Sequence, residues 1–96
     1  MKVVYHRLVH QDVSKAQRHY DRISVRLGDD FWDELMTLIE KASTTPLRYP
    51  VYSKPLRRAN LKRFPYHFLF RMVSDGIRIT VVRHNKRRPD YASDRR

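Results

Sequence analysis

Lysine, arginine and histidine side chains recur throughout residues 57–88, which read RRANLKRFPYHFLFRMVSDGIRITVVRHNKRR. Residues 57–96 contain twelve Lys or Arg and three Asp or Glu, a net charge of +9, whereas residues 1–56 carry only +2. Nearly all of the chain's formal charge of +11 therefore lies in its second half. Cations at this density attract polyanions and acidic protein segments over long range, so the sequence predicts a partner of that kind.

Five histidines are the other candidates for chemistry: His6, His10, His19, His67 and His84. None has the carboxylate-flanked pattern of a metal ligand, and the pair with i, i+4 spacing, His6 and His10, straddles the end of a predicted strand. The chain has no cysteine, which removes disulfides, thiolate nucleophiles and cysteine zinc sites. We therefore expect no metal and no cofactor.

The size and composition of the chain limit what can position these side chains. Ninety-six residues with 41% hydrophobic residues suit a single domain spanning residues 1–96. The N-terminus has no sustained apolar run, and no segment approaches the roughly 20 apolar residues that a membrane span requires. We expect a soluble, cytoplasmic, basic protein with no membrane partner.

The first half of the sequence predicts a strand and two helices. Residues 2–8 suit a short strand, Asp12 is expected to cap a first helix that Gly28 ends, and Asp29 or Asp30 is expected to cap a second. The short break between the helices predicts an antiparallel hairpin. Each helix has an apolar stripe, formed in the first by Val13, Ala16, Tyr20, Ile23 and Leu27, and in the second by Phe31, Leu35, Leu38, Ile39 and Ala42.

The second half predicts a three-stranded antiparallel meander. Residues 57–63, 66–73 and 77–83 are strand-like runs separated by Phe64-Pro65 and by Ser74-Asp75-Gly76. Residues 47–56 are expected to be a loop, and residues 89–96 a flexible tail. The fold class is therefore α+β, with the element order β-α-α-β-β-β.

Alternation along these runs predicts one dry and one wet face of the sheet. The helices are expected to cover Ala59, Leu61, Phe68, Phe70, Ile79 and Val81. The open face is expected to present Arg58, Asn60, Lys62, His67, Arg71 and Arg78, with His84 and Arg87 at the end of the last strand.

This arrangement resembles the RelE/ParE superfamily of toxins from bacterial type II toxin–antitoxin modules. The most specific segment is Lys62-Arg63-Phe64-Pro65-Tyr66, followed by an aromatic-rich strand that ends on Arg71. The next strand closes on His84 and leads into the basic cluster Lys86-Arg87-Arg88-Pro89. The resemblance covers essentially the whole chain and depends on the combination of order, length and charge.

The resemblance implies one of two activities. ParE-like members bind DNA gyrase and trap its cleavage complex without catalysis, whereas RelE-like members are ribosome-dependent ribonucleases that cut messenger RNA. Both are neutralised by an antitoxin. Residues 57–66 look more like the ParE-like branch, because Asn60 stands where RelE-like members tend to have a lysine. We expect a gyrase-directed toxin with an acidic cognate antitoxin, and a ribonuclease acting on the ribosome and mRNA is the alternative.

The resemblance also suggests site residues. A ribonuclease needs cations, a general acid and a general base, and these roles would fall to Arg58, Lys62, His67, Arg71, His84, Arg87 and Tyr91. Binding of the target or antitoxin would fall to Arg58, Lys62, Arg63, Arg71, His84, Lys86, Arg87 and Arg88. A plain nucleic-acid-binding module is a third class, but the sequence carries no helix-turn-helix, KH or RRM signature.

Overall fold

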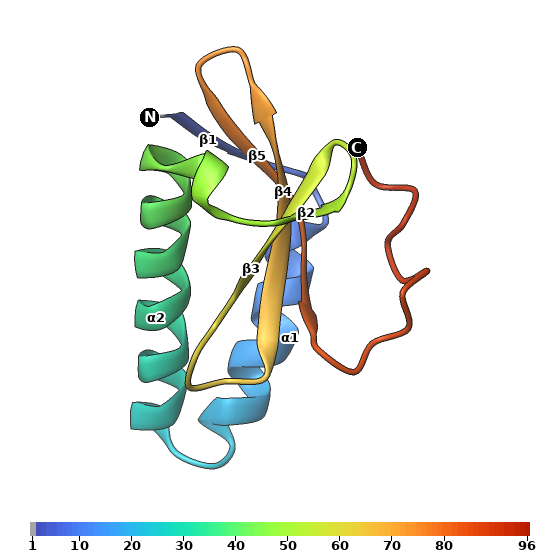
Figure 1. The fold of residues 1–96 in the computed structure, drawn as a ribbon. Helices are drawn as coiled ribbons and strands as arrows, with labels where there is room; N and C mark the ends of the chain where they lie inside the picture. Colours follow the sequence, from blue (N-terminus) through green and yellow to red (C-terminus); the bar gives the residue numbers. More distant parts are fainter. Residues whose placement is uncertain (1) are drawn as a thin grey trace.

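The computed structural model describes residues 2–96 (Figure 1). The elements, in chain order, are strand β1 (Lys2–Tyr5), helices α1 (Val9–Asp21) and α2 (Val25–Thr44), a short 3-10 helix η1 (Pro46–Arg48), and strands β2 (Val51–Ser53), β3 (Leu56–Asn60), β4 (Tyr66–Val73) and β5 (Gly76–His84). The predicted α+β class and element order are confirmed. Strand β2 is an addition, because it lies within residues that were expected to form a loop.

All five strands form one mixed sheet in the order β1-β5-β4-β3-β2. Strands β3, β4 and β5 are the predicted antiparallel meander, and β1 runs parallel to β5 on its outer edge. Helices α1 and α2 lie together on one side of the sheet (Figure 1). The molecule therefore has two layers, and only one face of the sheet is covered by helices.

The core lies between the helical hairpin and the sheet. Phe31 and Leu35 of α2 and Phe68 and Phe70 of β4 are completely buried. Tyr20 of α1 reaches the same cluster, with its ring centroid 5.3 Å from that of Phe31. Each fully buried large apolar side chain contributes about 1.5–3 kcal/mol to the stability of the fold, so these contacts fix the hairpin against β4.

The break between the helices lies before the predicted position. Helix α2 begins at Val25, and the hydroxyl of Ser24 caps it by accepting the N–H of Leu27 at 2.9 Å. Gly28 therefore lies inside α2, where a Cβ would overlap a side chain of α1. The predictions that Gly28 ends a helix and that Asp29 or Asp30 caps the next one are wrong, because Ser24 supplies the stronger signal.

Asp12 is not the predicted N-cap either. Helix α1 begins at Val9, which places Asp12 within its first turn, and its side chain is buried. One carboxylate oxygen accepts the backbone N–H of Val82 at 3.1 Å, and the same oxygen lies 2.6 Å from the guanidinium of Arg95. Asp12 thus joins α1 to β5 and to the C-terminal segment.

A β-bulge in β5 changes the predicted faces. Between Leu69 and Phe70 of β4 the register moves by two residues on β5, which leaves Thr80 as the additional residue. Beyond the bulge the side chains exchange faces. Val82 therefore packs in the core under the helices, and the prediction that Val81 lies on that face is wrong.

The C-terminal segment, residues 85–96, was expected to end in a flexible tail, but it packs back along the sheet (Figure 1). Arg95 donates to the carbonyl oxygen of Thr80 at 3.1 Å as well as pairing with Asp12. The carbonyl oxygen of Arg96 accepts from Nε of Arg78 at 2.9 Å. The contact with Thr80 lies on β5 immediately beyond the residues that pair with β1.

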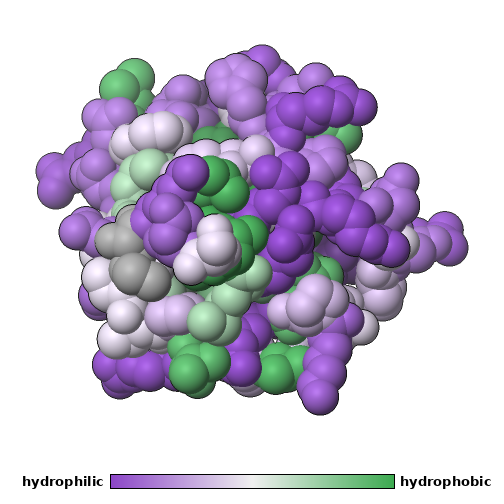
Figure 2. Space-filling view, turned by 90° about the horizontal axis from the view of Figure 1, so that it is seen from above, coloured by the Kyte–Doolittle hydropathy of each residue, from purple (hydrophilic) through white to green (hydrophobic). Residues whose placement is uncertain are grey.

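The face of the molecule shown in Figure 2 is mainly hydrophilic. Seen from above, polar side chains dominate and hydrophobic ones emerge in small groups (Figure 2). Ile23, predicted to belong to the first apolar stripe, lies in the connection between the helices and is 64% exposed. Within residues 2–96, no helix combines the length and apolarity needed to cross a membrane.

Candidate functional site

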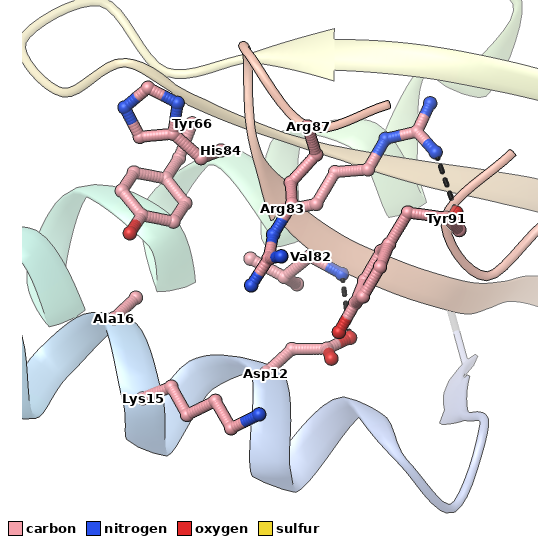
Figure 3. Close-up of a pocket in the computed structure, with 9 residues that line it drawn as sticks. All are labelled: Asp12, Lys15, Ala16, Tyr66, Val82, Arg83, His84, Arg87 and Tyr91. Atoms are coloured by element: carbon pink, nitrogen blue, oxygen red, sulfur yellow. Dashed lines mark hydrogen bonds between the residues drawn. The ribbon is translucent and has the colours of Figure 1, made fainter. Parts of the chain in front are cut away.

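A small cavity of about 70 Å³ lies where the first half of α1 faces the end of β5 (Figure 3). It collects residues from four parts of the chain: α1, the start of β4, the end of β5 and the C-terminal segment. Three of the seven residues expected in a ribonuclease site, His84, Arg87 and Tyr91, line it together. The other lining residues are Asp12, Lys15, Ala16, Tyr66, Val82 and Arg83.

The sheet register positions His84 beside Tyr66. The two residues are directly opposite in the β4–β5 ladder, and their ring centroids are 5.1 Å apart in an edge-to-face arrangement. The bulge at Thr80 turns His84 toward the helix side of the sheet. The backbone N–H of Lys86 donates to Nδ1 of His84 at 3.0 Å. Since Nδ1 is an acceptor, the neutral ring carries its proton on Nε2 and has no free lone pair.

The turn after β5 brings the positive charge of Arg87 to the cavity. The N–H of Arg87 donates to the carbonyl oxygen of His84 at 3.0 Å, which fixes the turn. The guanidinium of Arg87 lies 4.6 Å from the ring centroid of Tyr91, close enough for a cation–π interaction. Figure 3 shows the Arg87 side chain directed toward α1, where Lys15 supplies another positive charge. Sequence reasoning missed Lys15, since it belongs to a distant helix.

The cavity offers hydrogen-bond donors and no free carboxylate. The one acid that lines it, Asp12, is paired with Arg95 through contacts of 2.6 and 3.3 Å. Burial raises the pKa of the Tyr66 hydroxyl, and the charge of Arg87 opposes this in part. Tyr66 is therefore a protonated donor at neutral pH. A site that combines the positive charges of Lys15 and Arg87 with the Tyr66 hydroxyl and Nε2–H of His84 as donors suits an anion.

His67 does not lie on an open cationic face as predicted, because its side chain is only 1% exposed. Its Nε2 accepts from Nε of Arg83 at 2.9 Å, and its Nδ1 lies 2.8 Å from the Oδ1 of Asn85. Burial lowers the pKa of His67 to about 4, with the nearby charges of Arg58, Arg83 and His84 acting in the same direction and the Asn85 hydrogen bond opposing. His67 is thus a neutral positioning residue for Arg83 at physiological pH.

Arg58 and Arg71 of the expected site lie elsewhere. Nε of Arg58 donates to Oδ1 of Asn60 at 2.7 Å on the outer face of β3. Arg71 is opposite Arg78 near the far end of the β4–β5 ladder. Arg71 is five residue steps along β4 from Tyr66, at roughly 3.3 Å per step, so it is remote from the cavity.

Lys62 and Arg63 belong to the turn after β3, not to the strand that was predicted to span residues 57–63. Their backbone N–H groups point to the carboxylate of Glu34 on α2, with 2.6 Å for that of Lys62. Arg63 also forms an ion pair of 2.7 Å with Asp30. The backbone of this turn and the Arg63 side chain are therefore attached to α2.

The remaining two predicted cations follow β5 and are open to solvent. Lys86 is exposed, and Arg88 lies 3.5 Å from Asp90 in an exposed ion pair. Together with Arg87 they form a basic turn next to the cavity. No group of three or more potential metal ligands occurs among residues 2–96.

No protein-family model matches the chain, and no curated protein matches it by sequence. A chain in the structure of the chromosomal ParDE toxin–antitoxin system from P. aeruginosa superposes with a TM-score of 0.76 at 17% sequence identity. The match covers 88% of this chain and 95% of that chain. The protein therefore shares the fold of that chain, which confirms the RelE/ParE-like fold that the sequence suggested.

Proposed function

We propose that this protein is the toxin of a type II toxin–antitoxin module, that it acts in the cytoplasm on DNA gyrase, and that an acidic cognate antitoxin neutralises it. The toxin class is supported by the similarity to the ParDE structure over 88% of the chain, together with the basic turn of Lys86, Arg87 and Arg88. A binding toxin needs such a surface, but it needs no acid and base.

One observation favours gyrase binding over RNA cleavage. Nδ1 of His84 accepts the N–H of Lys86 at 3.0 Å, and His67 is buried. Neither histidine has a free lone pair within reach of a 2′-hydroxyl, and general-base catalysis requires such a lone pair. The cavity instead presents donors and cations, which bind negative groups without chemistry.

A ribosome-dependent ribonuclease is the second candidate. The observation in its favour is that His84, Arg87 and Tyr91 share one cavity with Lys15. In that case His84→Ala and Tyr91→Phe would each abolish both growth arrest and RNA cleavage. If the protein is instead a gyrase-binding toxin, the wild-type chain itself should cleave no RNA.

Association with the antitoxin should depend strongly on salt. A chain of net charge +11 attracts an acidic partner from a distance, and screening shortens that range to about 8 Å at physiological ionic strength. Stopped-flow measurements should show an association rate that falls steeply between about 50 and 500 mM NaCl, because the electrostatic attraction is increasingly screened over this range. An unchanged rate would remove the electrostatic basis of the proposal.

The deciding experiment is pulse labelling of bacteria after induction of this chain without an antitoxin. Thymidine and methionine incorporation are followed separately. The proposal expects DNA synthesis to fall first, and purified chain to inhibit supercoiling by gyrase. If methionine incorporation falls first and mRNA is cut, the ribonuclease function replaces the proposed action on gyrase. If neither changes, the chain is not a toxin of either kind.

A further inference from the structure

The outer face of the sheet, opposite the helices, contains a second and larger cavity. It has a volume of about 490 Å³ and lies between strands β2, β3, β4 and β5 and the C-terminal segment. We call it the outer groove. Its lining is mostly apolar or small apart from one cation, and comprises Tyr52, Ser53, Leu56, Leu69, Thr80, Arg83, Pro89, Ala92 and Ser93.

Arg83 is buried in this groove without a counter-charge. Its exposed fraction is 5%, and all of its hydrogen-bond partners are uncharged at neutral pH. Nε donates to His67, Nη1 to the carbonyl oxygen of Tyr91 at 2.8 Å, and Nη2 to the hydroxyl of Tyr52 at 3.0 Å. The Tyr52 ring also lies 5.4 Å from the guanidinium. Across residues 2–96 the ion pairs involve Arg63, Arg88 and Arg95, and none involves Arg83.

A buried charge of this kind is costly unless an opposite charge accompanies it. The fold meets that requirement elsewhere, since Arg95, whose side chain is 10% exposed, is paired with Asp12 at 2.6 Å. Arg83 also retains unused donor capacity. A guanidinium has five N–H groups, and three of those of Arg83 are used. Two N–H groups are therefore available for an anion that enters the groove.

We propose that the outer groove binds a carboxylate of an acidic peptide segment through Arg83, with apolar side chains of the peptide contacting Leu56 and Leu69. This inference rests on the proposed function, in which the partner is an acidic antitoxin, and it specifies where one of its acidic residues docks. A nucleic acid fits less well. Arg83 is the only Lys or Arg among the groove residues, and the ring of Tyr52 already faces its guanidinium.

The geometry of Arg83 suits this role. His67 is held neutral by burial, so it orients the guanidinium without adding a positive charge to the network. Tyr52 lies on β2, the outermost strand, next to the unpaired edge of the sheet. An extended acidic segment can thus reach Arg83 by passing over the exposed Ser53 at the rim.

The test uses two blocked, fluorescently labelled pentapeptides, one of alternating leucine and glutamate and the other of leucine and glutamine. Fluorescence polarisation should show saturable binding of the glutamate peptide. The glutamine peptide should bind at least about thirtyfold more weakly, as expected for loss of a buried charge partner. Equal binding of both peptides would overturn the proposal.

Variants locate the binding. Arg83→Gln should lose the preference for glutamate, provided that circular dichroism shows the native fold. Ser53→Glu keeps the proposal falsifiable if that variant does not fold, because Ser53 is exposed at the groove rim. Ser53→Glu should weaken glutamate-peptide binding at least tenfold, whereas the matched control Ser74→Glu, an exposed position in the β4–β5 turn, should change it less than about threefold.

Each outcome has a distinct meaning. Equal effects of the two serine substitutions would show that only net charge matters, which overturns the groove. A uracil hexanucleotide that binds instead, and that is sensitive to Ser53→Glu, would assign the groove to nucleic acid and overturn the peptide. Growth arrest does not enter this assay, so its result is independent of whether the chain is a gyrase toxin.

Discussion

The ion pair of Asp12 and Arg95 predicts that Arg95 is a major determinant of the stability of the fold. Side-chain exposures are 4% for Asp12 and 10% for Arg95. Besides the contacts of 2.6 and 3.3 Å between them, Arg95 donates to the carbonyl oxygen of Thr80, and Asp12 accepts from the N–H of Val82. In Arg95→Met, the Asp12 carboxylate keeps a single N–H donor from the protein, that of Val82.

Loss of one partner from a buried ion pair costs about 3–5 kcal/mol. The lower end applies to Arg95→Met, because the C-terminal segment can move aside and admit water to Asp12. We therefore expect the free energy of unfolding to fall by about 3 kcal/mol. For a domain of this size that corresponds to a decrease of roughly 12–24 °C in Tm. The Asp12→Asn substitution should cost less, since an amide oxygen still accepts from Val82 and Arg95 can turn toward solvent.

Urea unfolding followed by circular dichroism measures these differences. The matched control is Arg96→Met, which removes the same charge one residue later. The Arg96 side chain makes only weak contacts of 3.4 Å with nearby carbonyl oxygens, so its loss should change stability by less than about 0.5 kcal/mol. In the double variant Asp12→Asn/Arg95→Met, the cost should be well below the sum of the single costs. If Arg95→Met is as stable as the control, the C-terminal segment is not anchored as described.

Three other expectations follow from the geometry. The pKa of His67 is about 4 in the folded chain and 6.5 when unfolded, so the unfolded state takes up the proton first and stability falls as pH drops through this window. We expect a loss of about 2 kcal/mol between pH 8 and pH 5, which His67→Gln should abolish in urea titrations; an equal loss in both proteins would refute it. A Cβ on Gly76 would overlap the backbone carbonyl of Lys2, so Gly76→Ala should displace β1 and cost about 1–3 kcal/mol in the same assay. Replacing Arg87 and Arg88 together by methionine should abolish growth arrest while leaving Tm within a few degrees; arrest at equal expression would show that the basic turn is not the working surface.

Sequence patterns predicted the local elements well where the signals were redundant. The predicted strand 66–73 has the bounds of β4, because aromatic alternation is bounded by Pro65 on one side and Asp75-Gly76 on the other. The helix boundaries were less accurate. The pattern predicts a helix end at Gly28, but a glycine can equally mark a close approach between helices, as Gly28 does with Asp21 of α1. Ser24, four residues earlier, has the hydroxyl that a helix N-terminus requires.

The site depended on tertiary contacts that no local pattern contains. The resemblance to RelE-like enzymes suggested that His67 and Arg71 act together with His84. The structure buries His67 and places Arg71 at the other end of the ladder. Lys15 joins the cavity from α1, and a lysine on the polar side of an amphipathic helix gives no signal that it faces a strand sixty-nine residues later.

One signal for the bulge at Thr80 was nevertheless present in the sequence. Strict alternation from Ile77 places Ile79, Val81 and Arg83 on the same face, which would put a guanidinium under the helices. Such a core position would leave the charge without partners, so an extra residue before Arg83 was the more favourable arrangement. The bulge at Thr80 is that residue. It turns Arg83 to the outer face opposite His67 and turns His84 to the inner face opposite Tyr66. A single inserted residue thus creates both the outer groove and the cavity beside α1. Deleting Thr80 should exchange the two faces of the strand end and disrupt both sites together.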